Sequence, residues 1–166
     1  MREQWLLLER SIESDLDTIA RIYDLLRSTE ISTVESEEPL IVAGYRLHNL
    51  YSAFENAFRN IAAAFENHLD DRQGWHSQLL QRMRLDLMPV RPAVIGEVAY
   101  ECLDELRRFR HLYRSAYGIG LDRERMALVL RKALQLERPG TEELREFIGF
   151  LRSLGEDQPQ VPMKID

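Results

Sequence analysis

The stretch LHNLYSAFENAFRNIAAAFE, residues 47–66, decides the fold because its large apolar residues repeat with the spacing of an α-helix. The repeating residues are Leu47, Tyr51, Phe54, Phe58, Ile61 and Phe65. They lie four and three positions apart, which places their side chains on one side of a helix. A helix of this kind is stable when its apolar side is buried against another element. The stretch therefore predicts a long core helix with partners elsewhere in the chain.

The N-terminal part of the chain predicts the first of these partners. Apolar residues with the same spacing are Ile12, Leu16, Ile19, Tyr23 and Leu26. We expect this first helix to cover about residues 2–29. The core helix then begins at Pro39, because proline is favoured in a first helical turn and Glu37 and Glu38 precede it. It ends before the sequence DDRQG, residues 70–74.

Prolines and glycines bound the next two predicted helices. The third is expected from Trp75 to about Leu87, because the two prolines of the following MPVRP segment break a helix. The fourth is expected from near Ala93 to Gly118 or Gly120, since glycine readily adopts the left-handed conformation found at helix C-termini.

A fifth helix is predicted to begin in the sequence LDRERM, with Asp122 as its N-cap. Pro139 and Gly140 are expected to interrupt it. Thr141 would then cap a short last helix whose first turn is acidic.

These helices predict the fold class, since no segment shows the alternation typical of a β-strand. We expect an all-α protein, an antiparallel bundle of four or five helices. The length of 166 residues suits one domain. This domain is expected over residues 1–154, followed by a flexible polar tail over residues 155–166.

Charge and cysteine content limit the classes of function. A net charge of −6 excludes a protein that coats nucleic acid through a basic surface, so any contact with nucleic acid must be local. Cys102 is the only cysteine, which excludes an internal disulfide and fits a reducing compartment. The apolar run near the N-terminus is too short for a signal peptide or a membrane span. We expect a cytoplasmic protein without a membrane partner.

Positive charge nevertheless gathers in the sequence RRFRHLYRSAYG, residues 107–118. On a helix, one stripe would contain Arg107, Arg110, His111 and Arg114, opposite the apolar side. We therefore expect this stripe to face outward. One interpretation is a solvated helix face, with cations favoured near the C-terminal end by the helix dipole. The other is a phosphate site, because guanidinium groups match phosphate oxygens and histidine moves protons near neutral pH.

Four segments of the chain, taken in order, resemble the HepT-like branch of the HEPN superfamily. They are LHNLYSAFENAFRNIAAAFE, GWHSQLLQRM, VRPAVI and LDELRRFRHLYRSAYGIGLD. The likeness covers roughly residues 40–130, and the joint order makes it more specific than any one segment. The resemblance implies a HEPN-like helical bundle that forms a homodimer, in a group with many metal-independent ribonucleases. It also implies a toxin that acts on RNA beside a small nucleotidyltransferase antitoxin, which can adenylylate a tyrosine of the motif.

The signature of this family is an arginine, a polar residue, three variable residues, a histidine, one variable residue and a tyrosine. By this resemblance Arg110 takes the arginine position, His111 the polar position and Tyr117 the tyrosine position. Ser115 stands where the signature has histidine. Serine does not titrate in the useful range, so the departure falls on the residue expected to carry acid/base chemistry.

Three interpretations of this departure stay open. His111 could supply the imidazole, the protein could cleave RNA weakly, or it could bind nucleotide or RNA without cutting, as a noncatalytic partner of a nucleotidyltransferase. In a cleaving enzyme we expect a 2′-hydroxyl to attack phosphorus, with His111 moving the proton and Arg110 stabilising the phosphorane. Arg107 and Arg114 would bind the substrate. Tyr117 would be the modified tyrosine or an aromatic residue that closes the helix end.

The other polar residues predict no cofactor and no metal. The four histidines lack the His-x-x-x-His spacing, and one cysteine cannot complete a structural zinc site. Glu55 either pairs with an arginine across the bundle or lies in water, and Trp75 is expected to pack in the core. An arc of asparagines on the core helix hydrogen-bonds a partner helix, lines a groove or faces water. These are Asn49, Asn56, Asn60 and Asn67.

Overall fold

The computed structural model of the chain describes residues 2–29, 31, 36–66, 75–115 and 120–156. They form five helices: α1 (Arg2–Arg27), α2 (Glu38–Glu66), α3 (Trp75–Met83), α4 (Glu97–Ser115) and α5 (Arg123–Glu156). The predicted all-α class is therefore confirmed. Most of the predicted tail, from residue 157 onward, lies outside the described residues.

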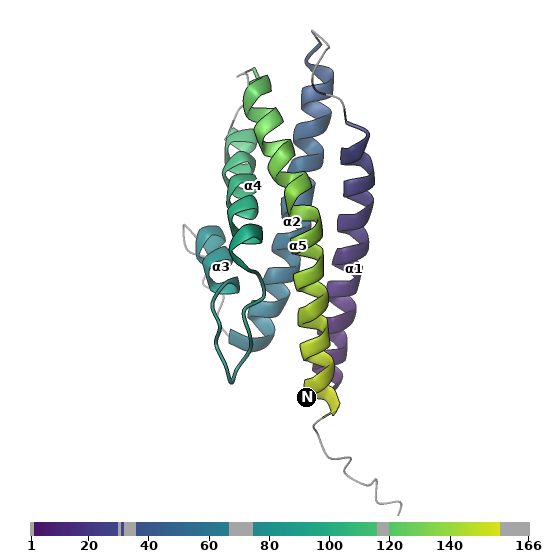
Figure 1. Cartoon of the computed structure of the whole chain (residues 1–166), viewed down its shortest axis with the longest axis vertical. Coiled ribbons are helices and arrows are strands. Elements are labelled where there is room, and N and C mark those ends of the chain that lie inside the picture. Colours follow the sequence, from purple (N-terminus) through teal and green to yellow (C-terminus); the bar gives the residue numbers. More distant parts are fainter. Residues whose placement is uncertain (1, 30, 32–35, 67–74, 116–119, 157–166) are drawn as a thin grey trace, which may run out of the picture.

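Four long helices run along the length of the molecule, and the short α3 lies at one side (Figure 1). The chain passes up α1, down α2, up α4 and down α5, so the bundle is antiparallel. α2 begins at the end of the molecule where α4 ends. There the hydroxyl of Tyr113 donates to the carbonyl of Ile41, 3.5 Å away. The first half of α2 thus lies beside the last turns of α4.

The apolar stripe of α2 lies in the core of the bundle, as predicted. Its buried members are Leu47, Tyr51, Phe54, Phe58 and Ile61. Phe65, farther along α2, stacks on Trp5 of α1 with ring centroids 4.8 Å apart. The buried hydroxyl of Tyr23 donates to the carbonyl of Ala133 at 2.8 Å, which joins α1 to α5. Removal of this apolar surface from water is the main force that holds the helices together.

Two asparagines of α2 also join it to α1. The amide of Asn56 donates to Asp15, and the amide of Asn60 donates to Ser11, each at 2.9 Å. The interpretation of these residues as contacts with a partner helix is therefore confirmed for both. Asn67 lies outside the described residues.

A single helix, α5, replaces the two helices predicted around Pro139, so this prediction was wrong. Thr141 is not an N-cap, because its hydroxyl donates to the carbonyl of Glu137 at 2.7 Å inside the helix. Gly140 is buried, and a Cβ atom there would lie 3.0 Å from the ring of Phe54. Close packing of α5 against α2 thus keeps the helix continuous despite the hydrogen bond that proline cannot make.

The connection between α3 and α4 is longer than predicted. α3 ends at Met83 rather than Leu87, and α4 begins at Glu97 rather than Ala93. The connection wraps around Arg91, whose side chain is completely buried. Its guanidinium donates to three backbone carbonyls and to a carboxylate of α2. This path lets the buried charge reach all of its partners, which a continuous helix would not.

The described part of α4 ends at Ser115, and the end predicted at Gly118 lies outside the described residues. Gly120 is not helical. The predicted N-cap of α5 is confirmed, since Asp122 Oδ1 accepts a hydrogen bond from the backbone N–H of Glu124 at 2.9 Å.

Candidate functional site

The basic stripe predicted on α4 does not face outward as a unit. His111 and Arg114 are exposed. The side chains of Arg107 and Arg110, by contrast, are only 26% and 17% exposed. The expectation of one solvent-facing stripe was therefore wrong for two of its four residues.

The cause is the orientation of α4 about its axis. Val98, expected on the apolar side, is 50% exposed, whereas Ala99 and Leu103 are completely buried. The centre of the buried face therefore lies closer to Arg110 than expected, about 40° from it on the helical wheel. This orientation directs the Arg110 side chain toward α2.

Arg110 packs against two residues of α2. Its Cζ atom lies 5.9 Å from the ring centroid of Tyr51, which is within range of a cation–π interaction. Its Nη2 atom lies 3.9 Å from Oε1 of Glu55, a carboxylate that is 7% exposed. The interpretation that Glu55 pairs with an arginine across the bundle is therefore confirmed. A buried carboxylate needs such a cation, because desolvation without a partner is costly.

Arg107 is engaged within α4 itself. Its guanidinium pairs with Asp104 at 2.8 Å, and Arg108 pairs with the other oxygen of the same carboxylate at 2.8 Å. Arg107 thus turns toward the start of the helix, away from the turn that contains Arg114. Arg107 therefore has a close carboxylate partner of its own, and the charges of Arg107 and Arg110 both act on Tyr51.

One face of α2 meets the C-terminal half of α4. Gly44, His48, Tyr51 and Glu55 follow one another at four, three and four positions, which is the spacing of a single helical face. Gly44 contacts the ring of Tyr113, and the His48 ring lies 6.1 Å from the same ring between centroids. The end of α4 therefore packs on this face of α2.

We use the name Arg110 site for Arg110 and Arg114 of α4 together with His48, Tyr51 and Glu55 of α2. Burial lowers the pKa of His48, and the charges of Arg110 and Arg114 lower it further, while Glu55 acts in the opposite direction. The imidazole is therefore neutral at neutral pH. Its Nδ1 atom is buried and has no hydrogen-bond partner.

Tyr51 is the structural support of the site. Burial raises the pKa of its phenol, and the charge of Glu55 adds to this effect. Its hydroxyl therefore keeps its proton and hydrogen-bonds Glu55. The same carboxylate is thus shared by a phenol and the guanidinium of Arg110, which holds all three groups in one arrangement.

The remaining residues predicted from the sequence lie at the end of α4 or beyond it. His111 follows Arg110 by one position and is exposed on a different side of the helix. The side chain of Ser115 and all of Tyr117 lie outside the described residues, as do the side chains of Trp75 and His76. The structure brings Arg110 and Arg114 together with His48, which the sequence interpretation did not select.

The sequence contained one signal for His48. Gly44, His48, Tyr51 and Glu55 form a second stripe on the core helix, beside the apolar stripe. A glycine, an imidazole, a phenol and a carboxylate at helical spacing are an unusual composition for a buried helix face. The apolar stripe is the stronger pattern, and by itself it does not indicate that His48 faces α4.

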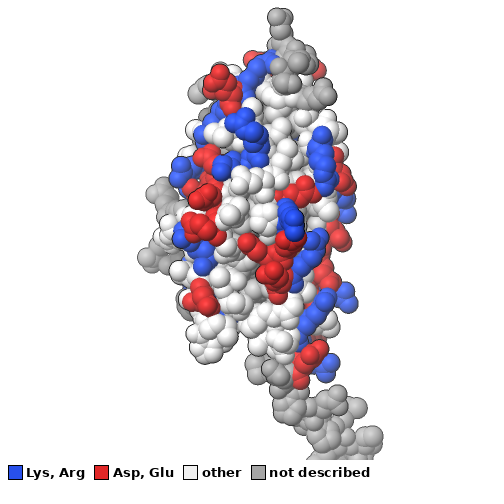
Figure 2. Space-filling model, in the orientation of Figure 1, with Lys and Arg blue, Asp and Glu red and all other residues white. Residues whose placement is uncertain are grey.

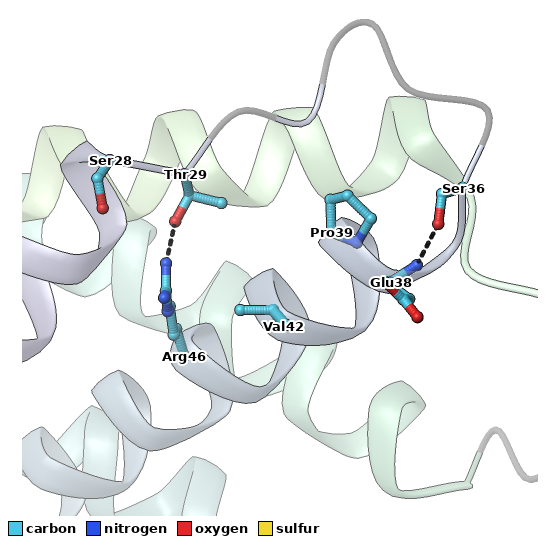
Figure 3. A pocket seen from close by; sticks show the side chains of 7 residues that line it. All are labelled: Ser28, Thr29, Ser36, Glu38, Pro39, Val42 and Arg46. Atoms are coloured by element: carbon cyan, nitrogen blue, oxygen red, sulfur yellow. Dashed lines mark hydrogen bonds between the residues drawn. The ribbon is translucent and has the colours of Figure 1, made fainter.

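Elsewhere on the surface, charges of both signs are mixed, as Figure 2 shows for one face of the molecule. An open pocket of about 420 Å³ lies between the end of α1 and the start of α2 (Figure 3). Its Arg46 donates to the Leu25 carbonyl at 2.9 Å and to the Thr29 hydroxyl at 2.8 Å. This guanidinium therefore joins α2 to the end of α1.

The described residues offer neither a metal site nor a membrane span. Within the described ranges, histidine, cysteine, aspartate and glutamate side chains nowhere form a group of three or more that could hold a metal ion. None of the helices built from described residues has the length and apolar character needed to cross a bilayer.

Comparison with known proteins adds one finding. Residues 42–151, about two thirds of the chain, match the family described as HepT-like protein. No curated protein and no solved structure matches the chain. The matched range contains His48, Tyr51, Glu55 and Arg110, so the whole Arg110 site lies within it. With its five-helix all-α bundle and this match, the chain belongs to the HepT-like family of the HEPN superfamily.

Proposed function

We propose that this protein is the toxin of a toxin–antitoxin pair and acts as a metal-independent endoribonuclease in the cytoplasm. The observation that supports the proposal best is the half-buried guanidinium of Arg110, which is held against Tyr51 and Glu55 beside an imidazole. By the family resemblance, Arg110 also takes the position of the motif arginine. Cleavage of RNA without a metal needs a cation that stabilises the phosphorane and a group that moves a proton, and a guanidinium next to a histidine supplies both.

The geometry of Arg110 suits a phosphate. Its Nη2 atom lies 3.9 Å from Oε1 of Glu55, which is longer than a hydrogen bond. The guanidinium is therefore held in position but keeps donors for another anion. Arg114, one turn later and exposed, adds a second positive charge. As a 2′-hydroxyl attacks phosphorus, Arg110 would stabilise the charge that develops on the phosphorane oxygens.

The test compares two arginines on the same helix. Arg110→Ala should lower RNA cleavage about 10²-fold or more, because it removes the charge facing the phosphorane. Arg108→Ala is the matched control, since Arg108 is 60% exposed and pairs only with Asp104 among the described residues. It should cleave like the wild type. Cleavage by Arg110→Ala at the wild-type rate would refute the assignment of this site.

The proposed partner is a small nucleotidyltransferase that acts as the antitoxin, and Tyr117 is the proposed site of adenylylation. Co-expression with a nucleotidyltransferase encoded beside this protein should add the mass of adenylate and relieve growth inhibition. Tyr117→Phe should gain no adenylate. Adenylylation of Tyr117→Phe would assign the modification to another residue.

A homodimer is proposed as the active form. Two Arg110 sites brought together by a twofold axis would concentrate positive charge that one acidic chain lacks. Light scattering of the purified protein should give twice the mass of the chain. A monomer that cleaves RNA at full rate would contradict this part of the proposal.

A second function is favoured by one observation, namely serine at position 115 of the motif. Without an acid/base group, the same arginines would bind nucleotide or RNA without cutting it, and the protein would be a noncatalytic partner of the nucleotidyltransferase. Salt-dependent RNA binding that is lost in Arg110→Ala, together with intact RNA after long incubation, would favour this function over the first.

A further inference from the structure

We propose that His48 is the catalytic base of the Arg110 site and takes the role of the histidine that the family motif would have at Ser115. This inference rests on the ribonuclease function proposed above. It assigns the acid/base step to α2, whereas the motif residues are all on α4 or directly after it.

The position of His48 supports the proposal. His48 lies on the face of α2 that meets α4, one turn before Tyr51 and two turns before Glu55. Tyr51 and Glu55 are the two residues that hold the guanidinium of Arg110. The His48 ring lies beside Tyr113, with 6.1 Å between the centroids. The imidazole and the phosphate-binding guanidinium are thus fixed by the same helix face.

The ring of His48 is held in place by packing, and its hydrogen-bonding groups are not all used by other residues of the protein. His48 is half-buried, and its Nδ1 is enclosed without a hydrogen-bond partner. A proton can therefore be exchanged with a bound molecule only through Nε2. For Nε2 to accept this proton, Nδ1 must carry the hydrogen of the neutral ring.

The charged groups around His48 also support the proposal. The groups that act on His48 are Arg110 and Arg114 from α4 and Glu55 from its own helix. Together with burial, the two arginines lower its pKa and keep the imidazole neutral at neutral pH. A neutral imidazole can accept a proton at once, and the same two cations attract the phosphate next to it.

The competing histidine is placed differently. His111 lies one residue after Arg110, which turns it about 100° around α4 from the side chain that would bind the phosphate. It is exposed. His48 faces α4 from the opposing helix, and its ring lies near enough to Arg110 and Arg114 for both charges to lower its pKa.

In the proposed step, one bond to phosphorus forms and another breaks. Nε2 of His48 removes the proton of a 2′-hydroxyl, and the 2′-oxygen forms a bond to the adjacent phosphorus. The bond between phosphorus and the 5′-oxygen breaks, this oxygen takes a proton from water, and the resulting hydroxide takes the proton from the His48 imidazolium, which regenerates the base. The products are a 2′,3′-cyclic phosphate and a 5′-hydroxyl, and no oxidation, metal or further reactant is needed.

The experiment measures single-turnover cleavage of RNA by the full-length protein. His48→Gln should lower the cleavage rate by about 10²- to 10⁴-fold, while binding of 2′-O-methyl RNA, which cannot be cleaved, changes by less than about twofold. Asn49→Ala, at the next position of α2, is the control and should cleave like the wild type. Added imidazole should restore cleavage to His48→Ala and should not restore it to Arg110→Ala, because only the first variant lacks a base.

Each outcome has a distinct meaning. Wild-type cleavage by His48→Gln would overturn the inference and leave the ribonuclease function standing, and loss of cleavage in His111→Ala would then identify the other base. A wild-type protein that cleaves no RNA would overturn both the function and the proton-transfer role of His48. If His48→Gln is inactive but also unfolded by circular dichroism, the imidazole rescue of His48→Ala decides, and its failure would overturn the inference.

Discussion

The ring of Tyr113 in α4 lies directly on the backbone of Gly44 in α2. A Cβ atom at Gly44 would lie 2.6 Å from Cε2 of Tyr113, closer than carbon atoms approach without displacement. The two helices therefore come this close because residue 44 has no side chain. This contact lies one turn before His48, so it also sets the spacing across the Arg110 site.

Gly44→Ala should destabilise the protein and weaken the site. The added methyl group costs about 1–3 kcal/mol through overpacking, which outweighs the gain of about 1 kcal/mol from the higher helix propensity of alanine. Gly149→Ala is the control, because nothing lies within 4 Å of a Cβ atom there. It should stabilise α5 by roughly 0.5–1 kcal/mol. Urea unfolding of both variants should give opposite signs, and two stabilising substitutions would contradict the close contact at Gly44.

The pKa of His48 should respond in opposite directions to its two kinds of neighbour. Arg114→Ala removes a cation and should raise the pKa, whereas Glu55→Gln removes an anion and should lower it. Arg108→Ala should leave it unchanged. Proton NMR of the imidazole ring across a pH series measures all three. A pKa of His48 that does not move in Arg114→Ala would place Arg114 away from the site.

The same shift predicts how stability depends on pH. The pKa of His48 is lower in the folded protein than in the unfolded chain, where it is about 6.5. The unfolded chain therefore binds this proton first as the pH falls. The contribution of His48 to stability should be complete above pH 6.5 and should be lost as the pH falls toward the folded pKa. In His48→Gln this slope should be absent from urea unfolding curves measured between pH 7 and pH 5.

The buried pair of Arg91 and Glu66 should be a major source of stability for the α3–α4 connection. Arg91 is completely buried and Glu66 is 7% exposed, with 2.7 Å between Nη2 and Oε1. Glu66→Ala should lower the free energy of unfolding by about 3–5 kcal/mol, because it leaves a buried guanidinium without its carboxylate. Glu142→Ala, which breaks the exposed pair with Arg138, should change it by less than about 1 kcal/mol. Equal effects in chemical unfolding would mean that Arg91 reaches water.

Ser115→His tests where the imidazole of this protein comes from. If His48 already supplies it, restoring the motif histidine in the wild type should change cleavage by less than about tenfold. The same substitution in the His48→Gln background should recover part of the lost activity, since it restores the acid/base residue of the family motif. A gain of about 10²-fold or more in the wild-type background would instead identify a protein weakened by serine at position 115.

The sequence predicted the parts of this protein that depend on neighbours along the chain. The spacing of Leu47, Phe54 and Phe58 was sufficient for α2, because a helix places residues three and four apart on one side whatever lies opposite. Asp122 was recognised as an N-cap for the same reason, since its partner is the backbone two residues later. Position along the motif selected Arg110 as a candidate, and its role stays a prediction.

The tertiary structure decided what depends on contacts across the bundle. Pro139 lies within one continuous helix because α5 packs closely on Phe54 of α2, and no local pattern contains that contact. The direction in which Arg110 points followed from the burial of Ala99 and Leu103, which set the rotation of α4 about its axis.

His48 is a residue that the sequence pattern did not select and that the tertiary structure placed near Arg110. The chain separates it from Arg110 by 62 positions, and helical periodicity orders residues within one helix but does not say which faces of two helices meet. The sequence by itself determined the all-α bundle, most of its helices and the place of Arg110 on α4. Only the packing of α2 against α4 decided which imidazole lies beside that arginine, because this choice depends on the rotation and separation of the two helices.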